Sequence, residues 1–426
     1  MKKTFLLLIL LSFFLSSEAQ NISVTFKVNN AAGKHLYLTK YSDYITEMEE
    51  VVFSSIIPEN GIIKHEFKAE NTEAYKILID YADVQIYLQP NTSYTITITY
   101  PKIISNINPF QNRQYLEINI SSSNNHDVNR LISDFNEEYD DFLLDKLYFQ
   151  SPRNMLSEHE KFKNEYLKKI NKNVDDFFTI YVEYSFGLTE ISLVDKIGKN
   201  FIDKYFTDKD VAYNSHEYFL LLKDVCKHTE YILNDSTLNN PRLKEVTYLY
   251  FLMMDFYGDY DKDEVLNLIK GFISKTKYLE TKLIGNNILT YLTRYRKGSS
   301  LPALNLESEN GNSYDILQSG KNMYLLFVNS DIEICADIIK EIETVDMESF
   351  GVIPLLISLD FSKTKINSDK LTLLKPADVG KVHLDLNIRN YPFAILIDKD
   401  GKILRYNAPV TKDRFIEVLK EEKSKN

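Results

Sequence analysis

Tryptophan is missing from the 426-residue sequence, and cysteine is almost missing, with only Cys226 and Cys335. Two thiols cannot form a disulfide framework, so packed hydrophobic cores must hold the fold together. The two cysteines lie far apart, in regions that we predict to be different domains. A single bridge between them is one alternative in an oxidising compartment, and two buried free thiols are the state that we predict.

Clusters of basic residues are also missing. The formal net charge is -11, and the lysines of the middle region alternate with Glu and Asp. Binding to a phosphate backbone needs clustered Lys and Arg, so we predict no nucleic-acid partner. The nucleotide-binding, nucleophile-elbow and metalloprotease motifs are absent, as is any set of residues with the spacing of metal ligands. We therefore expect no cofactor and no metal.

Long apolar runs are confined to the first residues of the chain. A charged start, Met1 to Lys3, precedes an apolar run from Phe5 to Leu15, and the small residues Ser17 and Ala19 follow. This order is typical of a secretory signal peptide over residues 1–19, cleaved near Ala19. No later stretch is apolar enough to span a membrane. We therefore expect the mature protein to be periplasmic or secreted and not membrane-spanning.

Alternating apolar and polar residues dominate the segment from residue 20 to residue 110. The runs Ile22–Val28 and Tyr94–Tyr100 alternate strictly and are rich in β-branched and aromatic residues. Such alternation is typical of half-buried strands. The pair Asn60 and Gly61 lies between two strand-like runs, which predicts a β-hairpin. We predict an all-β, sandwich-like domain here, with a partial barrel as the alternative.

A helical period replaces this alternation over residues 111–298. Apolar side chains recur on one face at Val128, Ile132, Phe135 and Tyr139, and two later segments repeat the pattern. These are amphipathic helices, so we predict an all-α middle domain. The residues Asp127, Ser157 and Asp261 each precede such a run and are predicted helix caps.

Strands and helices alternate over residues 299–426, which predicts an α/β domain. The apolar runs Met323–Val328, Val352–Leu359 and Phe393–Ile397 are predicted buried strands. Helices are expected near Cys335–Glu343 and over Thr411–Lys423, and the strand after the turn at residues 398–401 pairs back as a hairpin.

This C-terminal part resembles the thioredoxin-like family of exported thiol–disulfide proteins, the ResA/TlpA-like group. The resemblance covers about the last 130 residues and depends on the order and spacing of short motifs. These are the opening strand Leu301–Leu306, the turn at Asn310 and Gly311, the central strand and the residues after it, Leu325–Ser330, the loop Asn390–Pro392, and the strand and turn Phe393–Gly401. The whole chain also resembles a Bacteroidetes-type layout, in which a β domain of unknown function and a helical domain precede the thioredoxin-like domain.

The chain departs from this family at the position that carries the chemistry. The family has a C-x-x-C pair after its central strand, and here the matching residues run from Asp331 to Cys335, with Ile332 in place of the first cysteine. Dithiol exchange needs an attacking thiolate at that first position. The neighbouring charges of Asp331 and Glu333 would also disfavour a thiolate on Cys335.

The resemblance further implies that Pro392 is a cis proline, in a loop that faces the start of the helix after the central strand. We interpret Pro392 first as a structural residue. The alternative is that the loop still presents its backbone to an extended peptide. The candidate binding residues are therefore Asp331, Ile332, Glu333, Tyr391 and Pro392, and Cys335 is the one candidate catalytic residue.

These observations lead to three hypotheses. The first is a non-catalytic interaction or scaffold protein of the cell envelope, with an unidentified protein or peptide partner. The second is a single-cysteine thiol oxidoreductase or peroxide-handling enzyme, which requires an exposed Cys335 with a lowered pKa. The third is a glycan- or peptide-binding module that uses the tyrosine-rich β domain.

Overall fold

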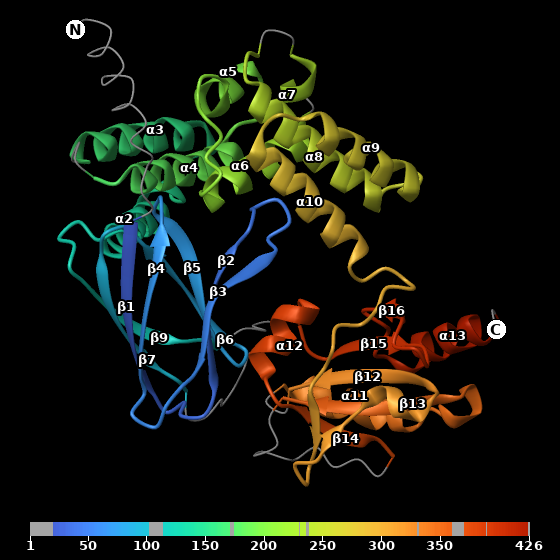
Figure 1. Cartoon of the computed structure of the whole chain (residues 1–426). Coiled ribbons are helices and arrows are strands. Elements are labelled where there is room, and N and C mark those ends of the chain that lie inside the picture. The colour runs from blue at the N-terminus through green and yellow to red at the C-terminus, as the bar shows by residue number, and fades with distance from the viewer. Residues whose placement is uncertain are drawn as a thin grey trace, which may run out of the picture.

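The structure is a computed structural model that describes residues 20–101, 114–170, 174–229, 231–235, 238–329, 332–359, 370–388 and 390–424. It has the three predicted parts, an N-terminal β domain, a helical domain and a C-terminal domain of sheet and helices (Figure 1). The predicted signal peptide lies outside the described residues. None of the helices within these ranges is long and apolar enough to cross a membrane.

The N-terminal domain is a sandwich of two sheets around a shared apolar core. The first sheet contains, in spatial order, β4 (Ile62–Ala69), β1 (Gln20–Asn29), β7 (Ser93–Thr99) and β9 (Glu117–Ser122). The second contains β3 (Glu49–Ile56), β2 (His35–Tyr41), β5 (Glu73–Ile79), β6 (Ala82–Leu88) and β8 (Gln114–Tyr115). Because β9 pairs with β7, the sandwich extends beyond residue 110, where we expected it to end.

The predicted hairpin at Asn60 and Gly61 is wrong, although the turn is present. The strands on either side of it, β3 and β4, belong to different sheets and do not pair. Gly61 has φ of 67° and accepts a hydrogen bond from the Val28 N–H at 2.8 Å. A Cβ atom at this position would lie 2.2 Å from the Val28 carbonyl oxygen. The glycine therefore allows the chain to cross between the sheets against β1, rather than to reverse within one sheet.

The middle domain consists of packed helices with two apolar cores. Its helices are α2 (Val128–Phe142), α3 (Pro152–Lys169), α4 (Asp176–Leu193), α5 (Lys199–Ile202), α6 (His216–His228), α7 (Tyr231–Asn234), α8 (Pro241–Tyr257), α9 (Lys262–Lys275) and α10 (Leu279–Thr293). π-Helical turns follow α2 and α5, at Leu143–Leu147 and Asp203–Thr207.

Two of the three predicted helix caps are confirmed. The Asp127 carboxylate accepts from the Arg130 N–H, and Asp261 accepts from the Glu264 N–H at 2.8 Å. The cap predicted at Ser157 is wrong, because α3 already begins at Pro152, after Ser151. Proline has the φ that a first helical residue requires, so it starts this helix one and a half turns earlier than the apolar period indicated.

The loop between β2 and β3 connects the sandwich to the helical domain. Tyr44 and Ile45, at its tip, are buried in the helical core, where the Tyr44 ring stacks on Phe219. The Asp43 carboxylate accepts from the loop's own backbone and, at 2.7 Å, from the Asn287 side chain of α10. Figure 1 shows this pair of strands reaching from the sandwich toward the helices above it.

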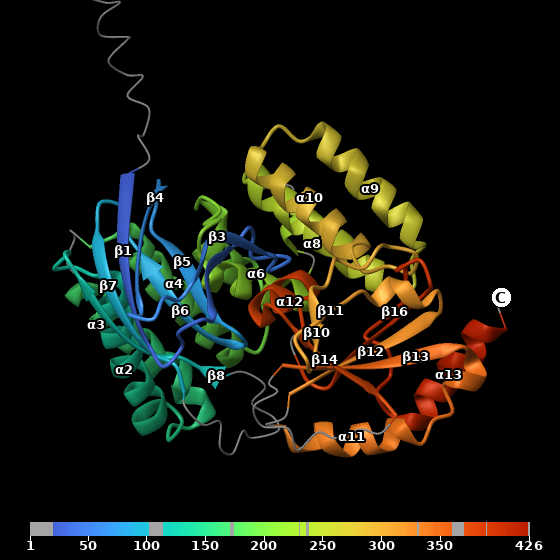
Figure 2. The same ribbon diagram turned by 60° about the horizontal axis from the view of Figure 1, so that its bottom comes forward.

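The C-terminal domain contains a mixed sheet with helices on both faces. In spatial order the strands are β11 (Ser313–Tyr314), β10 (Leu306–Ser308), β14 (Thr372–Pro376), β13 (Val352–Ser358), β12 (Asn322–Val328), β15 (Phe393–Ile397) and β16 (Ile403–Tyr406). The helices are α11 (Glu333–Glu343), α12 (Val379–Leu386) and α13 (Lys412–Lys423), with 3₁₀ turns at Ile316–Ser319 and Glu348–Phe350. Figure 2 shows α11 and α13 on one side of the sheet and α12 on the other.

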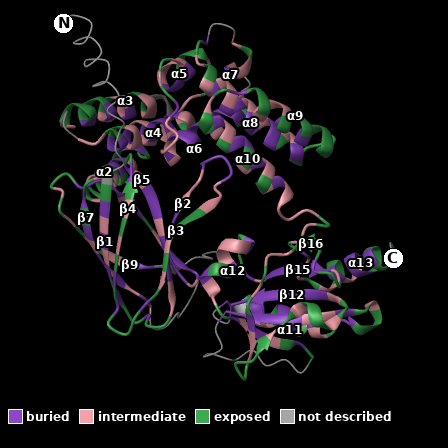
Figure 3. Ribbon diagram, in the orientation of Figure 1, coloured by how far each residue is buried: buried purple, intermediate pink, exposed green. Residues whose placement is uncertain are grey.

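This topology is thioredoxin-like. The parallel strands β12 and β13 are joined through the crossover helix α11. After α12, the strand β15 runs antiparallel to β12 and pairs with β16 in a hairpin, and α13 closes the domain. The predicted strands at Met323–Val328, Val352–Leu359 and Phe393–Ile397 and the two predicted helices are therefore confirmed, and the central strands β12 and β15 are buried along most of their length (Figure 3). The opening strand expected at Leu301–Leu306 is wrong, because residues 301–305 form no strand and β10 begins only at Leu306.

Replacing Phe327 by Ala should lower the free energy of unfolding by about 3–5 kcal/mol, because the ring is fully buried in β12 opposite Phe393. Ile334→Ala on α11 is the control, since Ile334 is 50% exposed and should change stability by about 0.5 kcal/mol or less. Urea unfolding followed by circular dichroism measures both. Equal effects of the two substitutions would contradict the register of the central strands.

Candidate functional site

Cys335 and Ile332 lie at the N-terminal end of α11, directly after the central strand β12. Ile332 is the residue before the helix, and the Cys335 N–H donates to its carbonyl at 2.9 Å. Both side chains are buried, Ile332 at 3% exposed and Cys335 at 0%. Asp331 lies outside the described residues, and for Glu333 only the backbone position, as first residue of α11, is described. The sequence position of a first cysteine is thus filled by an apolar side chain that packs inward.

The Cys335 thiol is protected against ionisation. Burial raises its pKa to about 11, and a hydrogen bond with the Asn329 backbone opposes this shift only in part. A buried thiolate is disfavoured because it loses the solvation of its charge. Cys226 is also free and buried, and burial raises its pKa to about 12. The prediction of two buried free thiols is confirmed.

Tyr391 and Pro392 form the loop that faces this helix start, and the peptide bond between them is cis. The Tyr391 hydroxyl donates to Nε2 of His383 at 2.7 Å, and Nδ1 of His383 donates to the Ile388 carbonyl at 3.0 Å. The pKa of Tyr391 is raised well above its usual value, first by burial and then by the nearby Cys335 and Tyr81. The predicted site residues Cys335, Ile332 and Tyr391 therefore share one buried cluster.

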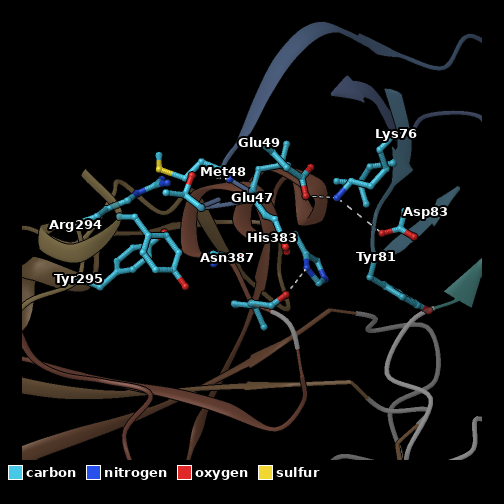
Figure 4. Close-up of a pocket in the computed structure, with 15 residues that line it drawn as sticks. Glu47, Met48, Glu49, Lys76, Tyr81, Asp83, Arg294, Tyr295, His383 and Asn387 are labelled. Carbon is cyan, nitrogen blue, oxygen red and sulfur yellow. Dashed lines mark hydrogen bonds and ion pairs between the residues drawn. The ribbon is translucent and has the colours of Figure 1, made fainter. Parts of the chain in front are cut away.

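Tyr81 belongs to the β domain, yet it packs into the core of the thioredoxin-like domain. It precedes β6, is 9% exposed, and is part of the cluster that contains Ile332, Cys335 and Tyr391. Figure 4 shows Tyr81 at the end of the β-domain strands, beside the cavity that His383 also lines. The β domain thus contributes a side chain to the core that contains Ile332, Cys335 and Tyr391, and this side chain lies near Tyr391.

A carboxylate on α12 fixes this contact between the domains. Oδ1 of Asp378 accepts from the Lys381 N–H and caps the helix, while Oδ2 accepts from the Tyr37 hydroxyl and lies 3.2 Å from Nδ1 of His35. The two surfaces are close enough that α12 needs a glycine here. A Cβ atom on Gly380 would lie 2.9 Å from the Tyr37 ring.

A small polar cavity remains where all three domains meet. Its volume is about 70 Å³, and its lining includes Lys76, Arg294 and His383, one from each domain (Figure 4). Lys76 is held by Glu49 and, at 3.9 Å, by Asp83, while Arg294 donates to the Asp385 carbonyl at 2.7 Å. Pockets for organic ligands usually have volumes of about 300–1,000 Å³. This cavity has room for a few water molecules instead.

The sequence identified the thiol and the proline loop but missed the residues by which the β domain contacts this domain. Tyr81, Tyr37, His35 and Asp378 lie on elements separated by some 300 residues in the chain, so no local spacing connects them. Asp378 alone carried a signal, because an Asp three residues before Lys381 at the start of an apolar run is typical of a helix cap. Within the described ranges, no group of three His, Cys, Asp or Glu residues is placed to hold a metal ion.

Among known proteins, the chain shows similarity only to solved structures. A thioredoxin-like protein from Bacteroides caccae is 13% identical, with 64% of this chain and 95% of that chain covered and a TM-score of 0.31. A thioredoxin-like protein from Porphyromonas gingivalis is 20% identical over 31% of this chain and 96% of that one, with a TM-score of 0.27. A thiol:disulfide interchange protein from Bacteroides is 20% identical over 30% of this chain and 91% of that one, also with a TM-score of 0.27.

No family model matches the chain, and no curated protein matches it. The identities to the solved structures are too low to transfer an activity. The thioredoxin-like assignment therefore depends on the strand order and the parallel and antiparallel pairing of the C-terminal sheet itself.

In a Cys226→Ser background, alkylation of Cys335 in the native protein should be slow at pH 8. With a pKa of about 11, about one thiol in a thousand is ionised at that pH, and the thiol is also fully buried. The labelling rate should rise with pH toward 11, and unfolding in urea should accelerate it at constant pH. Fast native labelling with a midpoint below about 8.5 would contradict a buried, inert thiol.

In the same background, Tyr81→Ala should accelerate native labelling of Cys335 about tenfold or more. Loss of the Tyr81 ring should lower the local opening free energy by at least about 1.4 kcal/mol, which corresponds to that factor. Tyr166→Ala is the control, because Tyr166 is also 9% exposed but lies in a core of the helical domain. If both variants label alike, Tyr81 does not cover the thiol.

Proposed function

We propose that the chain is an exported, non-catalytic interaction or scaffold protein of the cell envelope. On this proposal the thioredoxin-like domain serves as a structural part and carries out no dithiol exchange. The observation that carries the proposal is the burial of Ile332, Cys335 and Tyr391 in a core to which the β domain contributes Tyr81. A substrate disulfide has to reach an attacking sulfur, and here the side chain of Cys335 is fully buried.

The chemistry at the helix start supports the same proposal. Exchange requires a thiolate that is exposed enough to attack, with a pKa near or below ambient pH. Ile332 has no thiol, and the pKa of Cys335 is raised to about 11. A second cysteine that could resolve a mixed disulfide is also distant, because Cys226 is buried in the core of the helical domain. The chain therefore lacks a suitable group both for the attack on a substrate disulfide and for the resolution of the mixed disulfide.

The arrangement of the domains supports a scaffold role. The β domain inserts Tyr44 and Ile45 into the helical core and Tyr81 into the thioredoxin-like core. These contacts leave the outer surfaces of all three domains for other molecules. On the helical domain, Leu144, Tyr148 and Phe149 are 64%, 61% and 80% exposed, and clustered apolar exposure of this kind often marks a protein contact.

The single-cysteine alternative is opposed by this geometry, because it requires an exposed Cys335. The alternative in which the β domain binds a glycan or peptide is not addressed by these contacts and stays a prediction. Export to the periplasm or cell surface likewise stays part of the proposal, because the signal peptide lies outside the described residues.

The full mature chain should show no turnover in an insulin-reduction assay with dithiothreitol, and its rate should equal that of a Cys335→Ser variant. The physical reason is the absence of an accessible thiolate at the start of α11. A thioredoxin with an intact dithiol serves as the positive control.

Hydrogen peroxide consumption by the same two proteins provides the second arm of this test. Turnover of insulin or peroxide that disappears on Cys335→Ser would overturn the non-catalytic proposal and establish the single-cysteine enzyme. Equal background rates in both assays are the expected result.

A further inference from the structure

A second concave site lies where the helical domain meets the outer strand of the thioredoxin-like domain. It is a groove of about 680 Å³, lined from the helical side by the end of α8, the start of α9 and the end of α10, and from the other side by β16 and α13. The volume is within the range of about 300–1,000 Å³ that is usual for organic ligands. The groove is distinct from the small cavity where the three domains meet, although Tyr291, Tyr295 and Asn387 line both.

Aromatic rings form much of the wall of this groove, and they are fixed in place. The rings of Tyr295 and Tyr406 stack at 4.2 Å with an angle of 3° between their planes. Both hydroxyls donate to backbone carbonyls at the end of α12, that of Tyr295 to Asp385 at 2.6 Å. At the rim, Tyr257 packs edge to face on Phe256 and is 61% exposed. The groove therefore offers a preformed aromatic surface with one open ring.

The charge of the groove is opposite to that of the whole protein. The chain carries a formal net charge of -11, but four cationic side chains line this groove. They are Lys262, Arg296, Lys297 and Arg405. Among its described lining residues the one acid is Glu422, which is buried between Lys297 at 2.5 Å and Arg405 at 3.8 Å.

Two of these four cationic side chains, Lys262 and Arg296, can form an ion pair with a ligand. Lys262 lies over the Phe256 ring at 5.3 Å, and no carboxylate in the described part of the chain forms an ion pair with it. Arg296 is 3.3 Å from Asp263, which is 79% exposed. An ion pair exposed to this degree contributes little to stability, so an anion that enters the groove can replace Asp263 at modest cost.

We propose that this groove binds a small organic anion that carries a flat ring. The anionic group would bind between Lys262 and Arg296, and the ring would pack on Tyr257. Charge-assisted hydrogen bonds and ring stacking are both strengthened in a concave, partly desolvated site. A long polyanion such as a nucleic acid fits less well, because the acidic surface beyond the groove repels it.

The site links two domains, which gives binding a structural consequence. Tyr257, Lys262 and Arg296 come from the helical domain, while Tyr406 and Arg405 come from the thioredoxin-like domain. A ligand that also contacts Tyr406 or Arg405 binds the docked arrangement, and it stabilises this arrangement by an amount that grows with the logarithm of the ligand concentration above the Kd. This binding does not involve Cys335, so the result of the insulin assay leaves it unaffected.

The test uses the full mature chain and the fluorescent anion anilinonaphthalene sulfonate, whose ring system carries one negative charge. Tyr257→Ala and Lys262→Gln should each weaken the binding of this probe about fivefold, the scale of one exposed cation–π or stacking contact. The matched controls are Tyr260→Ala and Lys270→Gln. Tyr260 is 66% exposed, and Lys270 is exposed on the same helix as Lys262; neither lines the groove.

Uncharged phenylnaphthylamine, titrated into the same proteins, separates charge from apolar contact. Its affinity should fall with Tyr257→Ala and be unchanged by Lys262→Gln. The proposal is overturned if the groove variants bind the anion as tightly as their matched controls. It is also overturned if Lys262→Gln weakens the uncharged probe as much as the anion. All four positions are exposed, so circular dichroism should show that each variant is folded.

Discussion

The carboxylate of Asp378 is the contact on which the arrangement of the thioredoxin-like domain depends. One of its oxygens caps α12, and the other binds Tyr37 and His35 of β2. A single side chain therefore orients the helix and ties it to another domain. Because α12 carries His383, which binds Tyr391 beside Cys335, this tie also determines what surrounds the thiol. On the proposed function, the low reactivity of Cys335 depends on the domain interface as well as on the local sequence.

Side chains of the β domain are buried in the cores of the other two domains. These contacts, more than the linkers, hold the three domains together. The β domain places Tyr44 and Ile45 among the helices and Tyr81 in the thioredoxin-like core. Polar contacts at the edges of these insertions, such as Lys223 with Glu47 at 2.8 Å, restrict the remaining rotation. Buried aromatic rings set the spacing of the domains, and the polar pairs around them set the orientation.

The local sequence pattern predicted most of the strands and helices, but residues 301–305 form no strand, and the pattern also failed where an element pairs with a distant part of the chain. Strict alternation predicted β1, because one of its faces lies in the sandwich core. The same reasoning misread Asn60 and Gly61, since a turn signal does not say which sheet the next strand joins. The displaced cap at Ser157 reflects a proline that begins α3 earlier. The loss of the first cysteine at Ile332 could be read from the sequence. The packing of Tyr81 against another domain could not be predicted, because a single tyrosine in a strand-rich segment does not indicate which residues it contacts.

The insertion of Tyr44, Ile45 and Tyr81 has a consequence for the order in which the protein matures. These residues belong to the β domain, yet their pockets are built from helices and strands synthesised more than a hundred residues later. Until then the rings are exposed to solvent on an otherwise complete sandwich. Contacts of such long sequence separation form slowly, because a long loop must close before they give any stabilisation. The N-terminal domain therefore acquires its final surface only when the last domain has folded against it.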